Sequence, residues 1–585
     1  MFHPRNQLLT ISNQRNKRSG NSSPLSNYPT LAPGFMTTRH AKIGAALCAA
    51  HMLAASSALA NNIQVTSVTL QNIDTTADTA NVQFSLSWEN SWRVTAGPAN
   101  WDAAWVFVKY HTGDLNWKSA ALDVVDASHS VPTGATLDMG VNGTRGMGAF
   151  IYRSAAGTGN NAWSNIKLKW NYGADGVSDA ALVTLDVHAV EMVYIPSGAF
   201  SAGDGVSRAG AADIATLIDG TVPLNAAPYR VIATGPTATG PVAGALSAVG
   251  LVAGSYKPIP TTFPNGFDAY YIMKYEGSQS QWAAFLNTTS KLPAIAYNYF
   301  EILNPQVGAA PPRDQLQGRQ VFFSSDLPAP AIIPGPVPPN PAPAVPTRPI
   351  VQSKFPDRAF VSSEAATLAY LDWSGLRPMT EFEFEKVARG PVTPVPGEFA
   401  WGTADVALLT YGSPAAGTLS LSNDGLPNEG PAVNYNELGG NAWVRATILT
   451  LPAGGPILGP SRVGMFAKPS YTGPTPPRIQ SGAGYYGVMD LTGNVSELVA
   501  KWAFPLATST VLTFVADHGD GLLATTGLHN VPGWALTPAG ATFYGLRGGS
   551  FAEAAAPMSQ RSLLAAGTLT NPGIRGVRTA PVVAP

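Results

Sequence analysis

A single cysteine, Cys48, most constrains how this 585-residue chain can be held together. It lies in an apolar stretch from Ile43 to Leu59, between a charged segment that begins at Met36 and the small residues Ala58-Leu-Ala60. This order is typical of a secretory signal peptide. If cleavage follows Ala60, the mature protein contains no cysteine. It can then have no disulfide, no thiolate metal site and no thiol nucleophile.

We therefore expect residues 1–60 to be an N-terminal extension and signal peptide, with the true start at Met36. The expected location is the periplasm or the exterior of a bacterium. The apolar stretch is too short, and too rich in alanine, to favour a membrane span, so none is expected in the mature form. The net charge of −1 gives no electrostatic reason to expect binding to nucleic acid or to an anionic membrane.

Residues 61–190 have the pattern of an all-β, sandwich-like accessory domain. Val82, Phe84, Leu86 and Trp88 alternate with polar residues, as in a strand with one buried face. Three further segments are predicted strands: 105–110, 166–170 and 182–187. Five tryptophans of this region could form a sugar-stacking platform, but packing in the core and at its edges explains them better because each buries a large area. They are Trp88, Trp92, Trp101, Trp105 and Trp117.

Residues 191–585 combine strands with a few helices. Amphipathic spacing predicts a helix from Ser278 to Asn287, and Ser362 to Trp373 is a second candidate. Thr380-Glu-Phe-Glu383 has the form of a capping box, and the helix it starts should stop near Gly390. Loop insertions are expected at about 206–262 and 304–360. The second contains a proline-rich tract that excludes helix and inner strand.

Seven sequence blocks in this region together resemble the formylglycine-generating enzyme (sulfatase-modifying factor) family. They occur in the family's order over about two-thirds of the chain. The blocks are Met192–Gly203, Tyr270–Glu276 with the helix to Asn287, Leu371–Arg389, Phe399–Gly402, Tyr486–Glu497, Leu546–Phe551 and Gly573–Arg578. The resemblance implies an α+β fold of the C-type-lectin kind, with twisted antiparallel sheets, two main helices and long loops. Sparse helices among many Gly and Pro residues agree with it.

The resemblance also bears on activity. The family's oxidases convert a target cysteine to formylglycine with two cysteines that bind copper, and copper(I) requires soft thiolate ligands. The first cysteine would fall at Ala552-Glu553 and the second between Ala554 and Ser559, and neither is present. This argues against copper and against oxidase activity, so we predict no catalytic residue. The mature histidines, His111, His129, His188, His518 and His529, show no metal-ligand spacing.

The resemblance also implies a calcium site, and the residues for that site are present in this sequence. Asp490, Gly493, Val495 and Glu497 match positions that in the family supply two side-chain and two main-chain oxygens to Ca²⁺. Ca²⁺ prefers six to eight hard oxygen ligands, and Gly493 permits a tight turn. The alternative is a turn in which Glu497 caps or pairs with an arginine. A second family site at Asn423 and Asp424 matches poorly.

The remaining charged residues of the blocks are expected to be structural. Arg377, Glu381, Glu385 and Arg389 should form a buried polar network, and Arg547 and Arg575 should also serve the fold. Three functions stay open. The first is a secreted, non-catalytic module that binds a glycan or a protein, because loops on a rigid base suit recognition. The others are a modifying enzyme with an atypical active site, and a structural surface component.

Overall fold

A computed structural model describes residues 62–113, 116–204, 262–289, 357–406, 440–444, 460–467, 475–501, 514–534, 544–551, 556–560 and 572–581. It also gives the backbone of short strands between these ranges. The predicted signal peptide, the proline-rich tract, Ala552 to Ala555 and the pair Asn423 and Asp424 lie outside the described residues. The chain is α+β and mainly β. Among the described residues, no helix has both the length and the apolar composition needed to cross a bilayer.

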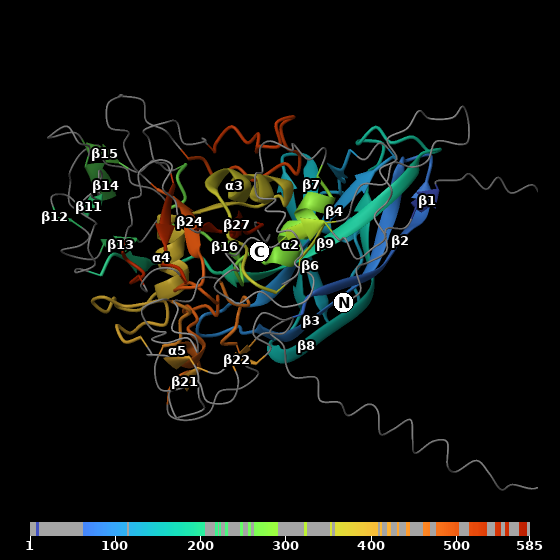
Figure 1. Cartoon of the computed structure of the whole chain (residues 1–585). Helices are drawn as coiled ribbons and strands as arrows, with labels where there is room; N and C mark the ends of the chain where they lie inside the picture. The colour runs from blue at the N-terminus through green and yellow to red at the C-terminus, as the bar shows by residue number, and fades with distance from the viewer. Residues whose placement is uncertain are drawn as a thin grey trace, which may run out of the picture.

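One large, mostly antiparallel sheet runs through the molecule (Figure 1). Its main path is β25-β24-β19-β27-β16-β9-β4-β7-β6, and only the β19–β24 pair on this path is parallel. The strands are β25 (Tyr544–Arg547), β24 (Ser496–Ala500), β19 (Arg377–Thr380), β27 (Gly576–Thr579), β16 (Tyr270–Met273), β9 (Leu182–Ile195), β4 (Asp102–His111), β7 (Arg145–Arg153) and β6 (Ala135–Asn142). Three short strands pair off this path: β1 (Leu8–Thr10), β5 (Lys118–Ser119) and β26 (Pro572–Gly573).

A second sheet packs on the N-terminal half of the first. It has the order β2-β3-β8, with β2 (Gln64–Asp74), β3 (Thr79–Arg93) and β8 (Gly157–Trp170). Alternate residues of β3 are buried, as the sequence pattern predicts. They share one apolar core with β8 and with one face of β4 and β9. The two sheets therefore form a sandwich in this region.

Strand β4 is buried along its whole length. Ala104, Val106 and Val108 enter the sandwich core, whereas Trp105 and Phe107 point to the other face and join a second core. Helices α2 (Gln279–Asn287) and α3 (Glu364–Trp373) contribute to that second core, which places this part of the large sheet between the β2-β3-β8 sheet and the helices. A 3₁₀ turn, η1 (Asp126–Ser128), lies before β6.

Strand β9 runs across the predicted boundary at residue 190. It pairs with β4 from Thr184 to Val193 and with β16 from Met192 to Ile195. The backbone hydrogen bonding of the sheet is thus continuous from the first region into the second. The division into two domains stays a prediction.

The helices follow the local sequence signals. Ser278 caps α2 (Gln279–Asn287), and Ser363 caps α3 (Glu364–Trp373). Thr380 and Glu383 form the predicted capping box of α4 (Glu381–Arg389), which ends at Gly390 with φ of 72°. The described helices also include the short α5 (Pro477–Ser481). These start and stop predictions are confirmed.

Short strands lie between the main elements. They are β10 (Phe200–Ala202), β11 (Leu217–Asp219), β12 (Val222–Pro223), β13 (Tyr229–Val231), β14 (Leu246–Val249), β15 (Tyr256–Pro258), β17 (Val321–Phe323), β18 (Val351–Ser353), β20 (Thr410–Tyr411), β21 (Thr418–Leu419), β22 (Leu421–Ser422) and β23 (Gly430–Pro431).

Residues 514–534 are held by hydrogen bonds to side chains of β4 and α3. Lys109 of β4 donates from Nζ to the carbonyl oxygens of Trp373 (2.6 Å) and Gly521 (2.9 Å) and to Ser119 Oγ (2.7 Å). The carboxylate of Asp372 accepts the backbone N–H groups of Asp520 and Asn530, each at 3.0 Å. A buried lysine of β4 and a buried aspartate of α3 therefore both hold this segment.

These two groups predict a minimum in the pH dependence of stability near neutrality. Burial lowers the pKa of Lys109 from 10.5 to about 7, so its contribution to the unfolding free energy rises as pH increases from about 7 to 10.5. Burial raises the pKa of Asp372 from 3.8 to about 7, so its contribution falls as pH increases from 3.8 to about 7. Each pH unit is worth about 1.4 kcal/mol per fully affected group.

Urea unfolding of the wild type and of two variants across this pH range measures both limbs. Lys109→Met should reduce the slope of the alkaline limb, and Asp372→Asn should reduce the slope of the acidic limb. Neither substitution should remove its limb, because burial also lowers the pKa of Lys386 to about 7 and raises that of Asp186 to about 7. Parallel pH profiles for all three proteins would contradict the prediction.

Candidate functional site

The predicted calcium residues lie on a tight turn that leads into β24. Asp490, Gly493 and Asn494 have φ values of 59°, 86° and 60°. A Cβ atom on Gly493 would come within 2.7 Å of Val444 Cγ1 and 2.9 Å of Trp443 O. Only glycine fits this backbone and this packing, so the turn has the tight form that the sequence predicts.

The two carboxylates of the turn are buried and partly satisfied. Asp490 Oδ2 accepts the N–H of Gly464 at 2.5 Å. Glu497 Oε1 pairs with Arg575 Nη2 at 3.2 Å, whereas its Oε2 is buried without a hydrogen-bond partner in the described structure. Burial raises the pKa of Asp490, and it raises the pKa of Glu497 to about 8 against the opposing effect of Arg575.

A third carboxylate, Glu276, helps to shape the turn and is not among the predicted site residues. It follows β16 and accepts the N–H of Val495 at 3.0 Å and the side-chain amide of Asn494 at 2.5 Å. Burial raises its pKa well above the usual value, and the nearby charges of Asp490 and Glu497 add to this. The sequence signal was its place in the block Tyr270–Glu276, but that block predicts no role for it.

The turn meets some requirements of a calcium site. The orphaned Glu497 Oε2 is a hard oxygen in need of a partner, and the tight turn can present carbonyl oxygens. The Glu497–Arg575 pair, however, is the arrangement that the alternative interpretation expects. In the described part of the chain, no group of three or more His, Cys, Asp or Glu side chains is arranged to hold a metal ion. The predicted set has only two such side chains, so calcium at Asp490, Gly493, Val495 and Glu497 remains a prediction.

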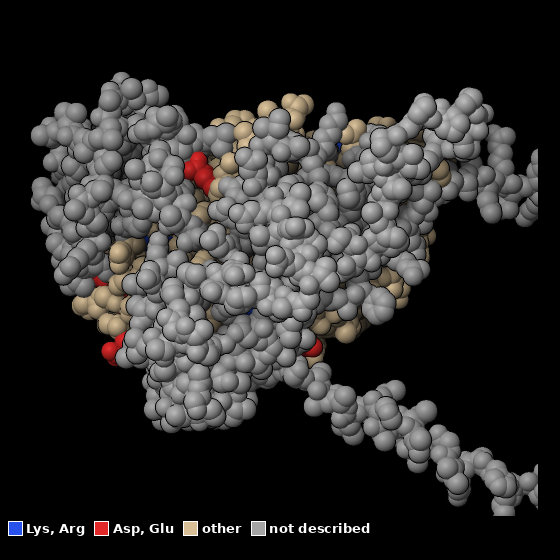
Figure 2. All heavy atoms as spheres, viewed as in Figure 1, with Lys and Arg blue, Asp and Glu red and all other residues tan. Residues whose placement is uncertain are grey.

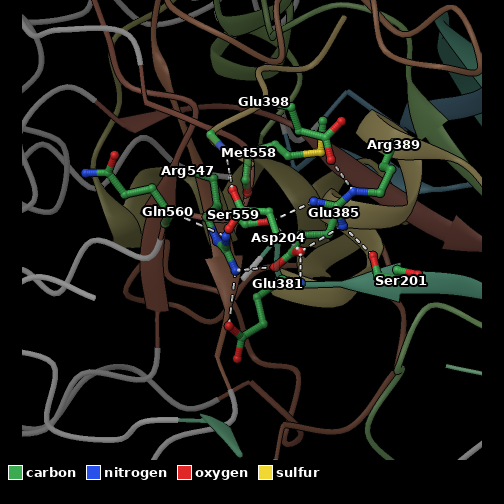
Figure 3. A network of polar contacts seen from close by, with 12 residues as sticks. Ser201, Asp204, Glu381, Glu385, Arg389, Glu398, Arg547, Met558, Ser559 and Gln560 are labelled. Atoms are coloured by element: carbon green, nitrogen blue, oxygen red, sulfur yellow. Dashed lines mark hydrogen bonds and ion pairs between the residues drawn. The ribbon is translucent and has the colours of Figure 1, made fainter. Parts of the chain in front are cut away.

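The second polar centre is a buried network around α4 (Figure 3). Arg389 donates from Nε to Glu398 (2.5 Å), from Nη1 to Glu385 (3.2 Å) and to the carbonyl oxygen of Ser201, and from Nη2 to Ser559 Oγ (2.7 Å). Both charged partners of Arg389 are fully or almost fully buried. All of these contacts form inside the protein, where water cannot replace them.

Arg547 extends the network at the other end. It pairs with Glu381 at 3.2 Å and with Glu385 at 3.6 Å, and it donates to the carbonyl oxygens of Met558 and Gln560. Ser559 Oγ in turn donates to Glu385 at 3.0 Å. The predicted network of Glu381, Glu385 and Arg389 is confirmed, and Arg547 belongs to it.

The expected place of Arg377 in this network was wrong. Arg377 pairs with Glu383 through two short contacts of 2.6 and 2.9 Å. The reason is local: β19 lies immediately before α4, and Glu383 folds back to cap the helix, so its carboxylate faces β19. Arg575 has the structural role expected of it, since it also donates to the carbonyl oxygens of Met273 and Met489.

The other candidate groups do not assemble into a site. Trp88, Trp105 and Trp117 are buried, so the five-tryptophan platform is not formed. The histidines lie apart and have separate surroundings. His518 accepts the N–H of Thr579, and burial lowers the pKa of His529 to about 4.

Figure 2 shows the described residues that are visible on one face of the molecule. In Figure 2 the described residues on that face are mostly neither basic nor acidic, and the acidic side chains lie at a few separate points. No protein-family model and no curated protein matches this chain. The site must therefore be interpreted from its own residues.

Proposed function

We propose that this protein is a secreted, non-catalytic binding module of the sulfatase-modifying-factor type, with a glycan or a protein as its ligand. The supporting observation is the network around α4. Ser559 and Met558 lie in the segment where the resemblance expects the second copper cysteine. Their polar atoms are engaged by Arg389, Glu385, Arg547 and the backbone of Glu398. These contacts stabilise a packed interior and leave its carboxylates paired with arginine.

Calcium, if bound, would be held by the side chains of Asp490 and Glu497 and the carbonyl oxygens of Gly493 and Val495. Its chemistry would be structural: a divalent charge would neutralise the buried carboxylates and fix the loops that extend from the turn. The protein would then present those loops in one conformation. A preformed binding surface loses less entropy when its ligand binds.

Calcium binding predicts a measurable gain in stability. At a free Ca²⁺ concentration one hundred times the Kd, the unfolding free energy should rise by about 2.7 kcal/mol relative to chelated protein. Calorimetric titration should give one site. Glu497→Gln should abolish both the gain in stability and the calorimetric binding signal. Asp123→Asn, which changes a carboxylate in the β-rich region, should leave both unchanged. Equal stability with calcium and with chelator would remove calcium from the proposal.

The binding function is tested by arrays of glycans and peptides probed with the mature protein, with Ca²⁺ and with chelator. A saturable hit that chelation abolishes is the expected result. Incubation with copper and a cysteine-containing peptide provides the opposing test. Formylglycine detected by mass spectrometry would contradict the non-catalytic proposal. Light scattering over a range of concentrations would detect the self-assembly expected of a structural component.

A further inference from the structure

Three charged side chains meet in the interior beside the turn that carries Asp490, where the N–H of Met489 bonds to the carbonyl oxygen of Lys274. Lys274 Nζ lies 3.5 Å from Asp102 Oδ2 and 3.6 Å from Glu191 Oε2. The side chain of Lys274 is 4% exposed, that of Asp102 is 0% exposed and that of Glu191 is 6% exposed. One ammonium group thus lies within reach of two carboxylates in a space closed to water.

The sheet register brings these residues together. Asp102 begins β4, Glu191 lies in β9, and Lys274 follows directly after β16. Asp102 pairs with Val193 and Ala104 with Glu191, so the two acidic residues point to the same face of the sheet. The N–H of Lys274 bonds to the carbonyl oxygen of Glu191, which places Lys274 opposite it. Three neighbouring strands therefore fix the cluster.

The surroundings favour reaction over simple ion pairing. Trp92 covers the Lys274 ammonium group, with 4.4 Å from Nζ to the ring centroid. Asp102 Oδ1 accepts Ser91 Oγ at 2.6 Å and the N–H of Trp92 at 3.0 Å, and Oδ2 accepts Trp88 Nε1 at 2.9 Å. Donors directed at Oδ1 are suited to stabilise negative charge that develops there. With all three groups ionised, the cluster would carry one positive and two negative charges, which is costly in a buried site.

We propose that Lys274 and Asp102 form a covalent isopeptide bond, with Glu191 as the group that transfers the proton. Glu191 passes a proton from the Lys274 ammonium group to Oδ2 of Asp102, and the freed Nζ lone pair attacks Cγ of the neutral carboxyl group. Negative charge develops on Oδ1, where Ser91 and Trp92 donate to it. Glu191 then carries a second proton from Nζ to the Oδ2 hydroxyl, which leaves as water while the C=O bond to Oδ1 re-forms.

The atoms of this reaction balance without any co-reactant. One ammonium and one carboxylate become one neutral amide and one water, no electrons are gained or lost, and Glu191 ends as it began. The reaction replaces a buried ion pair with a neutral amide. Strand packing supplies the proximity that an intermolecular amide synthesis lacks, because it holds the reacting groups next to one another.

A second buried lysine in the same sheet provides an internal comparison. Lys109 donates to two carbonyl oxygens and one hydroxyl, and among the described residues no carboxylate accepts from its Nζ. It therefore has no carboxylate in place to acylate it. Peptides that contain Lys109 should be recovered unmodified from the same digest in which Lys274 is cross-linked.

The test is the intact mass of the purified full-length secreted protein, together with sequencing of its N-terminus and peptide mapping. The expected mass is lower than that of the processed sequence by one water. Fragmentation should identify a branched peptide that joins Lys274 to Asp102. An intact mass with no loss overturns the proposal, and so does a water loss that maps to a single linear peptide or to a link with Glu191.

Three variants separate the roles. Glu191→Gln keeps the shape but removes the proton acceptor, and Lys274→Arg removes the nucleophile; both should show the full, unreacted mass. Asp102→Asn should react with loss of ammonia instead of water, and its product has the same mass as the cross-linked wild type. If an unreacted variant does not fold, the wild-type mass and its branched peptide still decide the question.

Discussion

Replacing Arg389 by methionine should lower the unfolding free energy by about 3–5 kcal/mol. The substitution keeps much of the side-chain volume but leaves the carboxylates of Glu385 and Glu398 buried without their main cation. It also removes the donor to Ser559, which joins α4 to residues 556–560. Urea unfolding, monitored by tryptophan fluorescence, measures the loss.

A matched control is Lys169→Met, which removes an ion pair with Asp123 at the surface. Lys169 Nζ lies 3.4 Å from Asp123 Oδ2, and its side chain is 35% exposed. An exposed pair contributes about 0–1 kcal/mol, so this variant should unfold almost like the wild type. If the two variants lost the same stability, the buried network would not have the role we assign to it.

Replacing Asp372 by alanine should destabilise the protein by about 1–3 kcal/mol, since two partly buried N–H groups would lose their shared acceptor. Those groups belong to Asp520 and Asn530. The effect should also be local, because the carboxylate links α3 to the segment 514–534. Relative to the wild type, backbone amide hydrogen exchange should accelerate more in residues 514–534 than in the rest of the protein.

The control for Asp372 lies in the segment itself. Asp520 accepts the N–H of Leu522 at an exposed position, where water can replace the contact. Asp520→Ala should therefore change global stability and exchange only slightly. Uniform acceleration of exchange throughout the Asp372→Ala protein would mean that the carboxylate does not anchor this segment in particular.

Sequence alone predicts the features that depend on neighbouring residues. The capping box at Thr380 and Glu383 needs only four consecutive residues, and the alternation in β3 needs one strand. The tight backbone at Gly493 is likewise local. Each of these predictions is confirmed because the responsible physics acts within a few residues.

Features that depend on distant partners could not be predicted in the same way. Glu276 is 219 positions from the N–H of Val495 that it accepts. The burial of β4 on both faces depends on α3 and on a sheet formed by other strands. The cluster of Lys274, Asp102 and Glu191 follows from the register of three strands. No periodicity in the sequence encodes which strands become neighbours.

Strand β9 has a consequence for how such a chain can evolve. One continuous strand serves the sandwich through β4 and the C-terminal region through β16. Recombination near residue 190 would divide that strand and leave each part with an unpaired edge. The N-terminal region is therefore poorly suited to transfer between genes as a self-contained cassette. We expect the two regions to be inherited together. Substitutions along β9 should be accompanied by compensating substitutions in its neighbours β4 and β16.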